Sequence, residues 1–111
     1  MSINRVYISG PMTGFDDFNV PAFNAEAARL RAMGLDVVNP AELNPQQPPP
    51  SWEQCMRNDI AALMTCDTLA LLSGWELSDG ANLELHIAHR VGIRIVNASE
   101  IVNCQAEEVP A

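Results

Sequence analysis

Two acidic side chains, Glu84 and Asp59, occupy positions that the sequence predicts to lie on apolar helix faces. On a helix over residues 79–91, at about 100° per residue, Glu84 falls inside the apolar arc that contains Leu83 and Val91. Glu84 also lies within about two turns of the helix start, where free N–H groups and the helix dipole favour negative charge. A desolvated but ionised carboxylate is a competent nucleophile or base. We therefore expect Glu84 to be the centre of the chemistry.

Asp59 repeats the pattern on a helix predicted over about 51–65. It lies on the same face as the apolar stripe of Trp52, Met56, Ile60 and Leu63. Either carboxylate alone could be a structural hydrogen-bonding group in the core, and that alternative stays open. Two carboxylates in unlike environments can divide acid and base roles between them. The sequence does not give their separation.

The segment Gly10-Pro11-Met12-Thr13-Gly14 is a candidate ligand-binding loop because its two glycines let the backbone approach a ligand. It matches neither the GxGxxG fingerprint nor the P-loop pattern, so an ordinary turn is the alternative. His86 and His89 lie three residues apart, but the helical wheel puts both on the polar side and no Cys or Asp cluster matches them. We predict neither a metal site nor a cofactor.

Alternating strands and helices must position these residues. Apolar runs predict strands at 5–9, 35–39, 68–72 and 93–96, and helices at about 21–33, 51–65 and 79–91. This alternation predicts an α/β fold in which helices cover both faces of a small parallel sheet. Right-handed crossovers favour the strand order 2-1-3-4. Ligands then bind beyond the carboxyl ends of the strands, near the switch between the first and third.

The chain of 111 residues is predicted to hold one domain over residues 1–104, followed by a flexible tail over 105–111. The proline-rich segment 40–50 is either a rigid connector or a wall or lid beside the site.

The charge and the cysteines limit the partners and the location. The net charge is -8, and the basic residues are six arginines without a lysine. This composition argues against duplex nucleic acid as a partner, since phosphate backbones are held by clustered basic residues. The three cysteines form no CxxC pair, and the sequence has neither a signal peptide nor an apolar run of membrane-spanning length. We expect a cytoplasmic protein that does not enter a membrane.

Three segments together resemble the nucleoside 2-deoxyribosyltransferase superfamily. They are VYISGPM at 6–12, Asp59 with Asp67 eight residues later, and SDGANLEL at 78–85. The text from about residue 4 to 97 resembles more closely the branch of that superfamily known as DUF4406. The resemblance implies a flavodoxin-like three-layer α/β/α fold, a homodimer or higher homo-oligomer, and cleavage of an N-glycosidic bond in a nucleoside or nucleotide.

The same resemblance implies a role for each matching residue. Glu84 would be the nucleophile at the anomeric carbon, Tyr7 would orient it, and Asp59 would assist protonation of the leaving base. Gly10, Pro11, Met12 and Thr13 in the first loop, with Ser78 and Gly80, would bind the substrate. Ser78 stands where the hydrolases of the superfamily carry a phosphate-binding serine and the transferases an aspartate. Pro11 and Thr13 stand where the hydrolases have a serine and an arginine, which leaves 5′-phosphate recognition open.

Three functions are therefore weighed. The first is a nucleoside or nucleotide N-glycosidase or deoxyribosyltransferase, with hydrolysis favoured by Ser78. The second is a non-catalytic nucleotide-binding or sensor module on the same fold. The third is cleavage of another N-glycoside, such as a dinucleotide cofactor.

Overall fold

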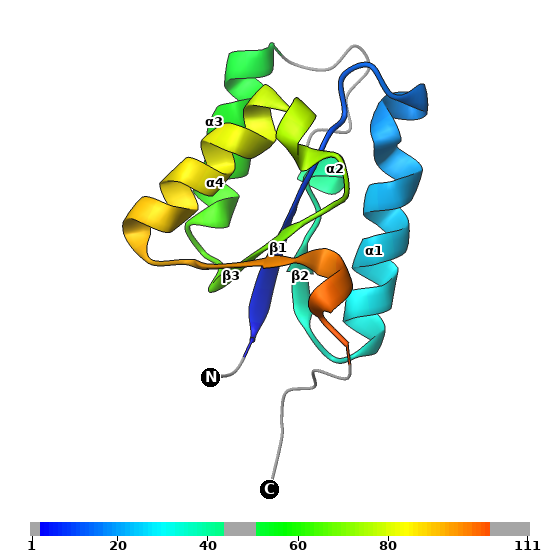
Figure 1. Ribbon diagram of the computed structural model, residues 1–111, viewed down its shortest axis with the longest axis vertical. Coiled ribbons are helices and arrows are strands. Elements are labelled where there is room, and N and C mark those ends of the chain that lie inside the picture. Colours follow the sequence, from blue (N-terminus) through cyan, green and yellow to red (C-terminus); the bar gives the residue numbers. More distant parts are fainter. Residues whose placement is uncertain (1–2, 44–50, 103–111) are drawn as a thin grey trace, which may run out of the picture.

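Four parallel strands form the centre of the computed structural model, which describes residues 3–43 and 51–102. They are β1 (Arg5–Ser9), β2 (Asp36–Val38), β3 (Thr68–Leu71) and β4 (Arg94–Asn97). The order is β2-β1-β3-β4 with every neighbouring pair parallel (Figure 1). Parallel strands buried on both faces need crossover helices, and this chain has them. The predicted flavodoxin-like α/β fold and its strand order are confirmed.

Three long helices cover the sheet. Helix α1 (Val20–Ala32) lies on one face, and α3 (Trp52–Leu63) and α4 (Asp79–Val91) lie on the other, which gives three layers (Figure 1). The predicted bounds of these helices hold to within about two residues, as helix ends usually do. One short helix was not predicted: α2 (Pro40–Leu43) follows β2 directly. Single 3-10 turns at Asp16–Asn19 and Trp75–Leu77 shape the loops, and a third, Ala98–Glu100, follows β4.

The alternation of side chains along β1 divides the core into two clusters. Val6 and Ile8 pack towards α1 with Phe23, Ala27 and Leu30. Tyr7 points to the other face and packs in a cluster with Leu63 of α3 and Ala88 of α4. The only tyrosine of the chain therefore faces the layer that carries Asp59 and Glu84.

The orientation of α4 corrects part of the helical-wheel prediction. Glu84 is buried, as expected, together with Ala81 and Ala88. Leu83 and Val91, which the wheel placed on the inward arc, are exposed. Ala88 packs in the core cluster with Tyr7 and Leu63, and Leu85 is partly buried against the same cluster, so α4 is rotated from the orientation that its large apolar residues predicted.

Two further predictions fall partly or wholly outside the described residues: residues 44–50 of the proline-rich segment, and the tail at 105–111. Within 3–43 and 51–102, none of the helices has the length and apolar character that crossing a membrane requires.

Candidate active site

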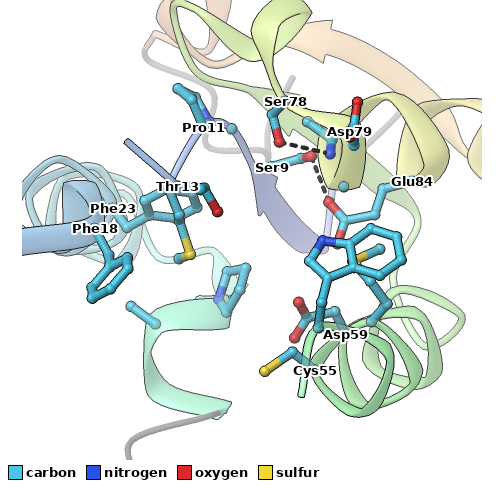
Figure 2. A pocket seen from close by; sticks show the side chains of 18 of the residues that line it. Ser9, Pro11, Thr13, Phe18, Phe23, Cys55, Asp59, Ser78, Asp79 and Glu84 are labelled. Carbon is cyan, nitrogen blue, oxygen red and sulfur yellow. Dashed lines mark hydrogen bonds between the residues drawn. The ribbon is translucent and has the colours of Figure 1, made fainter. Parts of the chain in front are cut away.

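A cavity of about 700 Å³ opens at the carboxyl edge of the sheet. Its wall is formed by the end of β1 and the loop after it, by α3, and by the turn that leads into α4 (Figure 2). This is the position at which ligands bind in parallel α/β sheets, beside the point where the strand order reverses. Eight of the nine predicted site residues line it, namely Gly10, Pro11, Met12, Thr13, Asp59, Ser78, Gly80 and Glu84. The ninth, Tyr7, is fully buried and reaches the site through a hydrogen bond to Glu84.

The Glu84 carboxylate is held by two hydroxyl groups from β1. The Tyr7 hydroxyl donates to Oε2 at 2.7 Å, and the Ser9 hydroxyl donates to Oε1 at 2.6 Å. Both oxygens are thereby fixed while the side chain keeps a face on the cavity (Figure 2). Hydroxyl bonds of this kind fix the direction of a carboxylate without neutralising its charge.

Burial changes the acidity of Glu84. The side chain is only 5% exposed, and desolvation raises its pKa from 4.5 to about 7. The hydrogen bonds from Ser9 and Tyr7 oppose this rise, and the nearby negative charge of Asp59 adds to it. A carboxyl group with a pKa near neutrality can change its protonation state during a reaction cycle. The same surroundings, burial first and then the charge of Glu84, raise the pKa of Tyr7 well above its usual value, so Tyr7 is a hydrogen-bond donor.

Ser9 is a site residue that the sequence reasoning missed. It is the last residue of β1 and lies two positions after Tyr7, so both side chains point to the same face of the sheet. A polar residue in phase with Tyr7 at the carboxyl end of a strand was the signal that could have identified it. Ser9 is buried and lines the cavity.

Asp59 faces the cavity from α3, as predicted, and is 9% exposed. Its negative charge acts on Glu84 and on Tyr7, so the three groups share one electrostatic environment. Cys55 lies one helical turn before Asp59 and also lines the cavity (Figure 2). Trp52 begins the same helix and stays half exposed because it forms part of the cavity wall, where the sequence had placed it in the apolar stripe of the core.

The first loop takes its shape from two contacts. A Cβ at Gly10 would lie 2.8 Å from Cβ of Leu72, so only glycine lets the chain leave β1 beside the end of β3. The Asn19 side-chain amide donates to the Pro11 carbonyl at 2.9 Å. Asn19 precedes α1 with a left-handed backbone, makes no side-chain capping hydrogen bond and holds this loop instead. Pro11, Met12 and Thr13 are thereby kept along the cavity wall.

The start of α4 forms another part of the wall. Ser78 is the N-cap, and its Oγ accepts a hydrogen bond from the Ala81 N–H at 3.1 Å (Figure 2). Gly80 permits close packing of α4 on α3, because a Cβ there would lie 3.2 Å from Sδ of Met56. Asp79, which was not among the predicted site residues, adds a carboxylate in the first turn.

A metal centre has no ligand set in the described part of the chain. Across 3–43 and 51–102, His, Cys, Asp and Glu side chains form no group of three that could hold an ion. The polar groups of the cavity are carboxylates, hydroxyls and one thiol, which suit acid, base or nucleophilic chemistry on an organic ligand.

The comparison with protein families agrees with the extent of the expected resemblance. The model of one family, described as a domain of unknown function (DUF4406), matches residues 4–97. No curated protein matches the chain. The matched range contains all four strands and the three long helices. Every residue that lines the cavity also lies within the matched range. The chain belongs to the DUF4406 family.

Proposed function

We propose that this member of the DUF4406 family cleaves the N-glycosidic bond of a nucleoside or nucleoside monophosphate, as a hydrolase or as a 2-deoxyribosyltransferase. One observation carries the proposal: the Glu84 carboxylate is buried in the cavity wall, and two hydroxyls fix its orientation. A nucleophile needs this combination of restricted motion and low hydration.

The reaction follows from the groups in the cavity. An oxygen of ionised Glu84 attacks the anomeric carbon of the sugar as the bond from that carbon to the base nitrogen breaks. The bonding electron pair leaves with the base, which takes up a proton delivered by Asp59, and Asp59 recovers a proton from the water or second base that attacks next. A glycosyl ester on Glu84 results, and water or a second base then attacks the anomeric carbon and regenerates the carboxylate. Tyr7 and Ser9 donate to the Glu84 oxygens and stabilise the negative charge when it returns.

The size and composition of the cavity support a nucleoside as the substrate. A volume of about 700 Å³ lies within the range of small-molecule sites. Trp52 and Phe18 line it with half-exposed rings and offer aromatic surface for a planar base. Ser9 of β1, with Ser78 and Glu84 at the start of α4, lies across the cavity from Phe18, and the sugar would meet Glu84 there (Figure 2).

Base release from a panel of nucleosides, 2′-deoxynucleosides and their 5′-monophosphates tests the proposal. Wild-type protein is expected to release free base, and Glu84→Gln is expected to release none. Glu53→Gln is the matched control, because it makes the same chemical change at an exposed position of α3 outside the cavity wall. Mass spectrometry of protein incubated with a slowly reacting 2-fluoro sugar analogue should show the sugar attached to Glu84. Equal base release by wild type and Glu84→Gln would refute the proposal.

Addition of a second base distinguishes the two reactions. A hydrolase releases base and free sugar whether or not another base is present. A transferase forms a new nucleoside only when an acceptor base is added.

One observation favours the sensor as a second candidate. A Glu84 pKa of about 7 leaves part of the population protonated at neutral pH, and a protonated carboxyl is a hydrogen-bond donor to a ligand. A sensor would bind nucleotides without turnover, and Glu84→Gln would not change the affinity.

A further inference from the structure

The described part of the cavity wall holds three carboxyl groups and no basic side chain. Asp59, Asp79 and Glu84 line it, and they come from two helices that face the same space (Figure 2). None of the arginines or histidines is among the residues that form its wall in the described chain. The chain has no lysine at all, and residues 44–50 and 103–111 contain no basic residue.

The positions of the arginines explain this absence. Three are already paired with carboxylates: Arg5 with Asp36, Arg29 with Glu26 and Arg31 with Glu42. Arg29 also donates to the carbonyl groups of Ala98 and Ile101, which holds it on the other face of the sheet. The remaining three lie on α3, at the last turn of α4 and at the first residue of β4, namely Arg57, Arg90 and Arg94. Arg90 and Arg94 therefore lie towards the amino edge of the sheet, away from the carboxyl edge that holds the cavity.

The start of α4 offers a phosphate little compensation. Helix N-termini attract anions through free N–H groups. Here the Ala81 N–H is taken by Oγ of Ser78, and the Asp79 carboxylate already occupies the first turn. A phosphate dianion in this cavity would meet like charges, and no cation of the described wall would balance it.

We propose that the cavity selects its substrate by charge: it takes a nucleoside without a 5′-phosphate, and it binds one with a cationic base more tightly than the neutral parent. This inference narrows the proposed function and rests on it for the identity of the ligand as an N-glycoside. The carboxylates attract the positive base, and the aromatic faces of Trp52 and Phe18 add cation–π attraction.

A cationic base also simplifies the bond cleavage. When the bond from the anomeric carbon to the base nitrogen breaks, the electron pair neutralises the positive ring and a neutral base leaves. No proton has to reach the base in that step. Glu84 still supplies the oxygen that bonds to the anomeric carbon, so atoms and charge balance.

Calorimetric titration of the Glu84→Gln variant measures the selection without turnover. The cationic ligands are 7-methylguanosine and 1-methyladenosine, titrated at pH 6. The neutral ligands are guanosine and adenosine, and the phosphorylated ligands are their 5′-monophosphates. Each ligand is also tested as its 2′-deoxy form. EDTA is present because a divalent cation could bridge a phosphate to a carboxylate. In the guanine series, the adenine series or both, we expect the cationic nucleoside to bind roughly tenfold more tightly than its neutral parent. The 5′-monophosphate of that parent should bind roughly tenfold more weakly than the parent itself. The preference should weaken as salt is added.

Asp79→Asn in the same background supplies the matched variant. It removes one cavity charge at an exposed position, so it should lower the preference for the cationic nucleoside several-fold and improve binding of the monophosphate. Glu53→Gln removes one charge outside the cavity wall and should change neither. Tighter binding of the monophosphate than of the nucleoside would overturn the proposal, as would cationic nucleosides that bind no better than neutral ones or do not bind.

The outcome is separable from that of the proposed function. If wild type releases no base while Glu84→Gln still ranks ligands by charge, catalysis is refuted and charge selection stands. If wild type cleaves nucleosides while the variant binds monophosphates more tightly, catalysis stands and charge selection is refuted.

Discussion

Asp67 and Glu84 are carboxylates at opposite edges of the same parallel sheet, and their surroundings differ. Asp67 lies just before β3 at the amino edge, is exposed, and accepts hydrogen bonds from the backbone N–H groups of Asn4 (3.1 Å) and Arg5 (2.9 Å). The Thr68 hydroxyl donates to it as well, at 2.7 Å. Glu84 lies at the carboxyl edge, is buried, and accepts from the hydroxyls of Tyr7 and Ser9.

The comparison shows how the partners of a carboxylate indicate its use. Asp67 ties the start of β1 to the start of β3, so its bonds belong to the fold. Glu84 is held by side chains that keep it facing a cavity, and its burial raises its pKa. The first arrangement stabilises the protein, whereas the second retains a group whose charge is costly to bury.

The largest effect should be the difference in base release between two variants that each neutralise one of these carboxylates. Glu84→Gln is expected to reduce base release by a factor on the order of 10³ or more, because the amide is no nucleophile. Asp67→Asn should leave kcat within about twofold, since Asp67 is outside the cavity wall. Steady-state assays of both variants measure the difference. A comparable loss of kcat in Asp67→Asn would remove the contrast between the two edges.

The pH dependence of stability should come next. The folded-state pKa of Glu84, about 7, exceeds the unfolded value of 4.5, so its contribution is fully present below about 4.5 and is lost as pH rises through 7. Relative to Glu84→Gln, wild type should lose roughly 2–3 kcal/mol of unfolding free energy between pH 5 and pH 8. Urea denaturation at both pH values gives the number. A difference that is constant with pH would mean that Glu84 stays ionised throughout.

Removal of the Asp67 carboxylate should change the free energy of unfolding by less. Asp67→Ala leaves the N–H groups of Asn4 and Arg5 without their acceptor, but water can reach them because the site is exposed. We expect a loss of about 1–2 kcal/mol in unfolding free energy. Urea denaturation at pH 7 tests this, with Glu53→Gln as a neutral reference. A loss well above that range would show that the amino edge is less accessible to water than its exposure indicates.

The smallest predicted effect is a shift of the pH profile of kcat/KM. The Ser9 hydroxyl lowers the pKa of Glu84, so Ser9→Ala should move that pKa to higher pH. Under the proposed mechanism the ionised form of Glu84 attacks, so kcat/KM should fall several-fold at pH 6 and little at pH 9. The full profile distinguishes this from a structural defect, which would lower activity equally at all pH values. Tyr7→Phe should move the profile in the same direction.

Much of the fold could be predicted because its signals are local. Apolar runs bounded by glycine or proline gave the four strands, and the alternation with helices allowed few topologies besides 2-1-3-4. Helix α2 escaped prediction because four residues are too few to show a helical period. The rotation of α4 also escaped prediction, because the wheel weighs large apolar residues, whereas the buried side is formed by Ala81, Glu84 and Ala88.

The sequence by itself determined the order of the elements and the residue types at the carboxyl edge, including an inward carboxylate at position 84. The family resemblance pointed to Tyr7 as the residue that orients Glu84, whereas only the tertiary structure added the Ser9 hydroxyl, which binds Glu84 from 75 residues away in the chain. It also placed all six arginines outside the wall of the cavity. The physical reason is that secondary structure follows from neighbours in the chain, whereas desolvation and charge depend on distances in space, which the packing of α3 and α4 on the sheet sets.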